Sequence, residues 1–75
     1  MSFEKIFADV FTIPLSSVFD GLALEDIPTW DSMSHMHIIV QLEESYQVQF
    51  TGDEIANIRT IADARSALIA LGVKL

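Results

Sequence analysis

An apolar stripe at helical spacing opens the chain and limits what it can fold into. The stripe predicts a helix from about residue 2 to residue 12, and it consists of Phe3, Ile6, Phe7, Val10 and Phe11. Ser2 can cap the start of this helix, and Pro14 stops it because proline has no amide hydrogen and restricts the residue before it. Three phenylalanine rings on one face have to be covered, so we expect further helices to pack against this one.

A long structured loop is predicted for residues 15–31. The apolar residues there have no regular spacing, and turn-forming residues such as Asp20-Gly21 and Pro28 are frequent. Five apolar side chains can hold the loop against the helices: Val18, Phe19, Leu22, Leu24 and Ile27. We also expect Trp30 to be half buried where the loop ends.

Helical spacing returns in the second half of the chain. We expect a helix from residue 32 to about residue 46, a short one over 53–58 and a last one over 60–71, with Phe50 turned inward between the first two. The inward residues are Ile38, Ile39, Leu42 and Tyr46, then Ile55 and Ile58, then Ile61, Ala64, Leu68 and Leu71. Thr60 and Asp63 have capping-box spacing, and Gly72 suits the end of the last helix. The predicted fold is all-α: a small four-helix bundle with three longer helices, a short third helix and a long first loop.

Length and composition narrow the class of protein. The 75 residues allow one domain with a small core, and the absence of cysteine excludes disulfides and thiolate metal sites. The hydrophobic content of 51% is enough for a core held by apolar packing. The chain has neither a basic start followed by an apolar stretch nor a long uncharged run, so we expect a soluble, cytoplasmic monomer.

The charge is unevenly distributed. Residues 1–54 contain ten of the eleven acidic residues and only Lys5 as a base, which gives −9, whereas residues 55–75 give +2. A negative surface repels phosphate backbones, so nucleic acid is not an expected partner, and a basic patch on another protein is. The alternative is that the charge only keeps the protein in solution.

The triplet Asp31-Ser32-Met33 lies where the long loop becomes the second helix. With Asp31 as the helix cap, the Ser32 hydroxyl lies exposed at the positive end of the helix dipole. His35 is close enough along the helix for a Ser-His pair, but the sequence has no Gly-x-Ser-x-Gly motif and no acid placed to orient this histidine. Asp31 and His35 alone make a weak metal site. We therefore expect neither catalysis nor a bound metal ion.

Four sequence blocks in this order resemble the acyl and peptidyl carrier proteins. The blocks are Ile-Pro-Thr-Trp-Asp-Ser-Met at 27–33, Leu-Glu-Glu-Ser-Tyr at 42–46, Asp-Glu-Ile at 53–55 and Arg-Thr-Ile-Ala-Asp at 59–63. In that family an Asp-Ser-Leu triplet opens the second helix, and here Met33 replaces the leucine. The resemblance implies one carrier domain over residues 1–75. It also implies that a phosphopantetheinyl transferase uses Mg²⁺ and coenzyme A to attach 4'-phosphopantetheine to Ser32, and that the arm holds an acyl or aminoacyl group as a thioester.

The second helix also suggests how partners bind. Met33, Met36 and His35 lie near the serine, and Glu43 and Glu44 follow further along, so we expect these five to contact the loading and cargo-processing enzymes. Carriers of fatty-acid synthesis have more acidic residues here, so a specialised pathway is favoured. Two alternatives remain: Ser32 only caps the helix, or the chain is an unmodified adaptor that binds through Met33, Met36 and the acidic face.

Overall fold

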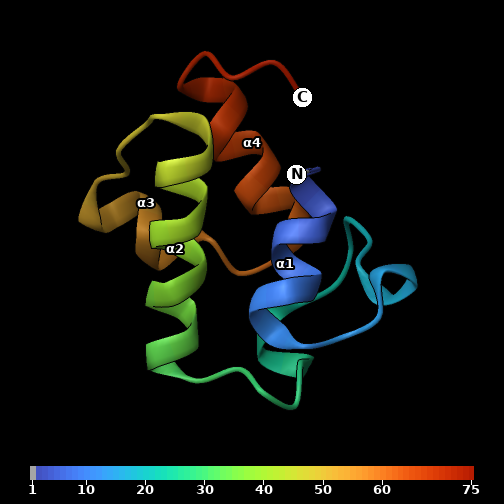
Figure 1. Cartoon of the computed structure of the whole chain (residues 1–75). Helices are drawn as coiled ribbons and strands as arrows, with labels where there is room; N and C mark the ends of the chain where they lie inside the picture. The colour runs from blue at the N-terminus through green and yellow to red at the C-terminus, as the bar shows by residue number, and fades with distance from the viewer. Residues whose placement is uncertain (1) are drawn as a thin grey trace.

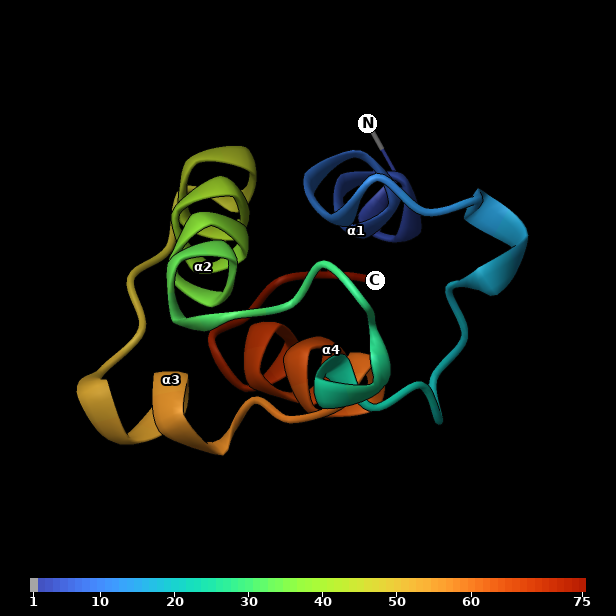
Figure 2. The same ribbon diagram turned by 90° about the horizontal axis from the view of Figure 1, so that it is seen from below.

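Four α-helices build the computed structural model, which describes residues 2–75. They are α1 (Phe3–Phe11), α2 (Ser32–Tyr46), α3 (Gly52–Asn57) and α4 (Ile61–Ala70), and two single 3₁₀ turns, Leu15–Ser17 and Leu24–Asp26, lie in the first loop. Helices α1 and α2 lie side by side and run in opposite directions (Figure 1). In the view turned by 90°, α4 lies across the core from this pair and α3 lies at the edge beside α2 (Figure 2). The predicted bundle is therefore confirmed.

Each helix begins at a side chain that accepts a hydrogen bond from its first turn. Ser2 caps α1, as predicted, by accepting from the Lys5 amide at 3.2 Å. Reciprocal capping boxes open the other three helices. Helix α1 ends before Pro14 because Thr12 adopts the left-handed conformation, with φ of 56°. Local sequence thus fixes where the helices start, which places Ser32 at the first position of α2.

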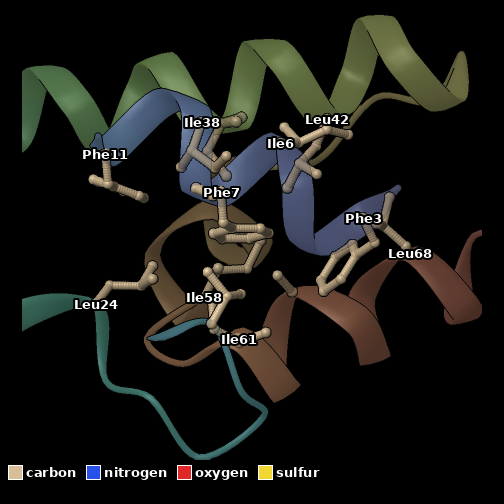
Figure 3. Packing of buried hydrophobic residues seen from close by; sticks show 14 of the residues in the cluster. Phe3, Ile6, Phe7, Phe11, Leu24, Ile38, Leu42, Ile58, Ile61 and Leu68 are labelled. Atoms are coloured by element: carbon tan, nitrogen blue, oxygen red, sulfur yellow. The ribbon is translucent and has the colours of Figure 1, made fainter. Parts of the chain in front are cut away.

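The core is entirely apolar among the described residues. The rings of α1 pack in a row, with centroids 5.1 Å apart for Phe3 and Phe7 and 6.4 Å apart for Phe7 and Phe11. Figure 3 shows this row facing residues of α2 and α4 and of the first loop. The fully buried residues of the other elements include Leu24, Ile38, Ile39, Leu42, Ile58, Ile61 and Leu68.

Two residues predicted to face inward are exposed instead. Phe19 is 57% exposed, because it begins a turn closed by the Leu22 amide and its ring lies over Gly21. Leu71 is 38% exposed because it is the C-cap just past the last helical residue, Ala70, where α4 runs out of the core. Gly72 then takes the predicted left-handed conformation, with φ of 93°.

Backbone hydrogen bonds tie the first loop to the start of α4. Ala23 and Thr60 form an isolated antiparallel bridge, and the Leu24 amide donates to the Arg59 carbonyl at 2.9 Å. The Ala62 amide donates to the Asp20 carbonyl, also at 2.9 Å. These bonds hold the loop as it approaches α2. Within residues 2–75, no helix has the length and apolar character needed to cross a bilayer.

Candidate functional site

The start of α2 places Ser32 outside the capping arrangement. Asp31 is the cap: its carboxylate accepts from the Ser34 amide at 2.8 Å, and the Ser34 hydroxyl accepts from the Asp31 amide at 2.8 Å. The Ser34 amide, and then its hydroxyl, hold the pKa of the Asp31 carboxyl below its usual value. Ser32 follows as the first helical residue and is exposed. The alternative in which Ser32 caps the helix is therefore wrong.

The electrostatic setting of Ser32 favours an anion on its hydroxyl. The first residues of a helix carry unpaired amide hydrogens and the positive end of the dipole, and the first turn of α2 contains no acidic side chain. Arg59 and Glu25 both line the same hollow as Ser32, so its lining contains charges of both signs and the helix end supplies the preference for an anion.

This hollow is a groove of about 370 Å³ between four parts of the chain. It brings together the first loop, the start of α2, the end of α3 and the link to α4. The residues that line it are Leu24, Glu25, Trp30, Ser32, His35, Met36, Ala56, Ile58 and Arg59. Sequence reasoning missed Glu25 and Arg59, because the backbone pairing of the first loop with the start of α4 brings them into the groove that Ser32 also lines.

His35 is half buried at the start of α2. Its Nδ1 accepts from the indole N–H of Trp30 at 3.2 Å, and its Nε2 lies 3.1 Å from the main-chain carbonyl of Ile55. Because an indole N–H can only donate, Nδ1 carries no hydrogen and Nε2–H donates to Ile55. Both ring nitrogens are engaged, so His35 forms no pair with Ser32.

The same contacts bear on the metal site that Asp31 and His35 could have formed. The ring of His35 points to Trp30 and Ile55, and the carboxylate of Asp31 binds the Ser34 amide. Among residues 2–75, no three histidine, aspartate or glutamate side chains gather where they could share a metal ion. The contacts of Asp31 and His35 therefore stabilise the local fold.

Met33 and Met36 form the outer surface next to the groove. Met33 is 83% exposed and Met36 is 47% exposed, so neither is a core residue. Val40, one turn further along α2, is also exposed and continues the apolar stripe. Both methionines are thus exposed enough for an approaching protein to contact them.

The two glutamates expected in the docking surface lie far from Ser32. Glu43 is eleven residues along α2, about 16 Å from Ser32 along the helix axis. Its carboxylate accepts from the Phe50 amide at 2.8 Å and so holds the loop between α2 and α3. Glu44 is exposed. Glu43 thus has a structural role, which could not be predicted from its position in the sequence.

The fold and the exposed serine define a class of protein: a small helical bundle of the carrier type, with a long first loop that ends at the serine. No family model matches the chain. Curated relatives do: an acyl carrier protein of Acidothermus cellulolyticus is 33% identical over 80% of this chain and 71% of its own length. One of Tropheryma whipplei is 35% identical over 92% of this chain and 84% of its own length. The chain therefore belongs to the acyl carrier protein family, whose members are carriers rather than catalysts.

A solved structure agrees with the fold. A Mycobacterium tuberculosis protein assigned to the acyl carrier proteins superimposes with a TM-score of 0.80, covering 93% of this chain and 99% of its own. The two sequences are 18% identical, so this likeness bears on the fold alone.

Proposed function

We propose that Ser32 carries a 4'-phosphopantetheine arm and that residues 1–75 form one carrier domain for an acyl or aminoacyl group. The observation that carries this proposal is that the helix cap and the exposed serine at the start of α2 are two different residues. Asp31 caps the helix, and Ser32 is left exposed at its positive end, beside the groove. A serine that does not cap its helix is available to bear a phosphate ester.

The residues around Ser32 fit such a group. A phosphodiester on the hydroxyl meets the positive end of α2, and the Arg59 side chain lines the same groove. Asp31, the nearest acid along the chain, already directs its carboxylate to the Ser34 amide. When bound, the arm supplies a thiol that holds the cargo as a thioester.

Attachment needs a partner enzyme, because His35, the histidine nearest to Ser32 along the chain, is not free to act as its base. A hydroxyl is a poor nucleophile until its proton is removed, and both nitrogens of His35 are bonded elsewhere. In the attachment step the Ser32 oxygen bonds to phosphorus and its proton passes to the transferase. The pyrophosphate bond of coenzyme A breaks, and adenosine bisphosphate leaves. Mg²⁺ enters with the transferase and coenzyme A.

The surface of α2 supports docking that is mainly apolar. Met33, Met36 and Val40 form its exposed stripe, and no acidic residue lies between Asp31 and Glu43. The net charge of −7 steers partners that carry basic patches, while the stripe makes the close contact. This sparsely charged helix supports assignment to a specialised biosynthetic pathway.

The test is the intact mass of the purified protein after incubation with coenzyme A, Mg²⁺ and a permissive phosphopantetheinyl transferase. We expect the mass of one phosphopantetheine to be added to the wild type and none to Ser32→Ala. Ser45→Ala is the matched control, since it removes an exposed serine from the other end of α2 and should be modified like the wild type. An unmodified wild type with several transferases would refute the proposal.

The exposure of Met33 supports a second candidate, an adaptor that binds its partner without modification. The two functions predict opposite results when the hydroxyl oxygen of Ser32 is removed. Ser32→Ala abolishes the activity of a carrier, whereas an adaptor with this substitution binds its partner as the wild type does.

A further inference from the structure

His35 joins three elements at the base of the groove. The ring belongs to α2, accepts a hydrogen bond from Trp30 at the end of the first loop and donates one to the Ile55 carbonyl of α3. The indole and imidazole rings also meet edge-on, with centroids 6.0 Å apart. One neutral form of the ring makes both hydrogen bonds, so the loop, α2 and α3 are held by a single side chain.

Helix α3 depends on such outside contacts. It has only six residues, which is too short for a helix to be stable by itself in water, and none of its residues is fully buried. Ile55 packs only partly against the core. The hydrogen bond from His35 is therefore one of the contacts that hold α3 against α2.

Behind His35 the interior is filled. Leu24 and Ile58 line the groove but are almost completely buried, at 1% and 2% exposed, so they form its floor. Figure 3 shows both pointing into the interior that Phe7 also occupies. A group that moves inward from Ser32 between α2 and α3 has to break the His35 contacts and displace packed side chains.

The groove itself suits a small ligand. Its volume of about 370 Å³ lies at the low end of the range for small-molecule sites, about 300–1,000 Å³. Trp30, Met36 and Ala56 give it an apolar wall, and Glu25 and Arg59 give it charged groups. Such a lining accepts a short carbon chain together with a polar substituent.

We infer that this carrier takes short acyl or aminoacyl cargo, which rests in the groove outside the core, and that His35 keeps longer chains out of the interior. The inference rests on the proposed attachment of the arm to Ser32. It assigns His35 a positioning role: the residue closes α3 against α2 and touches no reacting atom.

The test uses wild-type protein loaded at Ser32 with acetyl, butyryl or octanoyl phosphopantetheine from the matching acyl-coenzyme A, with loading confirmed by intact mass. The readout is the melting temperature. A chain taken into the core would raise it on the order of 3–6 °C for each methylene group buried. A chain short enough for the groove can also add some stability there, so the decisive comparison is between the butyryl and octanoyl forms, which we expect to melt at the same temperature in the wild type. A further rise from butyryl to octanoyl in the wild type would overturn the inference, whereas failure to load would overturn the proposed function instead.

Substitution of the histidine completes the design. In His35→Ala we expect the melting temperature to rise from butyryl to octanoyl, because α3 is no longer held against α2 and the longer chain can enter the core. His37→Ala is the matched control, since His37 is exposed on the same helix and should leave the wild-type behaviour unchanged. If folded His35→Ala showed no dependence on chain length, its assigned role would be wrong. Should that variant not fold, the wild-type series still decides where the cargo lies.

Discussion

At the scale of single residues, the site depends on which of two neighbours caps α2. Asp31 caps it and Ser32 does not, and this was predictable because capping involves only the next three residues. The partner of His35 was not predictable in the same way. Ile55 is twenty residues further along, and it contributes a main-chain carbonyl that no side-chain pattern marks.

Asp31 should make the stability of α2 dependent on pH. Its pKa is lowered in the folded protein by hydrogen bonds from Ser34, so its charged form stabilises the fold above the unfolded-state pKa. This contribution is lost as the pH falls through the lowered folded-state pKa. Asp31→Asn keeps a good cap without the charge. We expect the melting temperature of the wild type to fall relative to Asp31→Asn over that acidic range, and a constant difference between the two would contradict the assignment.

At the scale of elements, the groove exists because the first loop is bound to the start of α4. The bridge between Ala23 and Thr60 and the bond from the Leu24 amide to the Arg59 carbonyl set one side of it. Thr60 also caps α4, accepting from the Asp63 amide at 3.1 Å. A single cap therefore stabilises both a helix and the wall of the groove.

Thr60→Ala should show this double role. Loss of the cap is expected to cost about 1 kcal/mol, which lowers the melting temperature by about 4–8 °C in a domain of this size. Hydrogen exchange of the Leu24 amide should also become faster, because its acceptor at Arg59 is less firmly held. Thr60→Ser keeps the hydroxyl and should resemble the wild type. Unchanged exchange at Leu24 in a destabilised Thr60→Ala would show that the cap does not support the groove.

Local features of the helices could be predicted from the sequence, whereas contacts between distant segments could not. Helix positions and the inward residues of α1 and α2 were predictable because caps and helical stripes are local. Phe19 and Leu71 were predicted wrongly, since a turn and an early helix end turned them outward. The attachment of the first loop to α4 joins residues 23 and 60 through the backbone alone. For this reason the groove, with Glu25 and Arg59, could not be predicted.

At the scale of the whole molecule, one arginine offsets part of the acidic charge. Arg65 on α4 binds Glu4 of α1 at 2.8 Å and Asp20 of the first loop at 3.0 Å. Its guanidinium also lies 4.7 Å from the centre of the Phe3 ring. Through these contacts Arg65 joins three elements of a chain whose net charge is −7.

Arg65→Gln is expected to lower stability by about 1 kcal/mol at low salt, given partly exposed ion pairs and one cation–π contact. Its melting temperature should lie about 4–8 °C below that of the wild type. Added salt should raise the melting temperature of both proteins by screening the repulsion between acidic residues. It should raise that of the variant more, because the wild type loses the Arg65 attraction in the same salt.

Lys74→Gln is the control for net charge, since it removes one positive charge near the end of the chain and leaves the Glu4 and Asp20 contacts intact. Thermal melts of the three proteins from low to molar salt distinguish the two effects. If Arg65→Gln and Lys74→Gln melted at the same temperature at every salt concentration, the specific contacts of Arg65 would add nothing to stability beyond the effect of one positive charge on the net charge. A larger loss in Arg65→Gln that shrinks with salt would show that the acidic carrier fold is held together by specific pairing as well as by its apolar core.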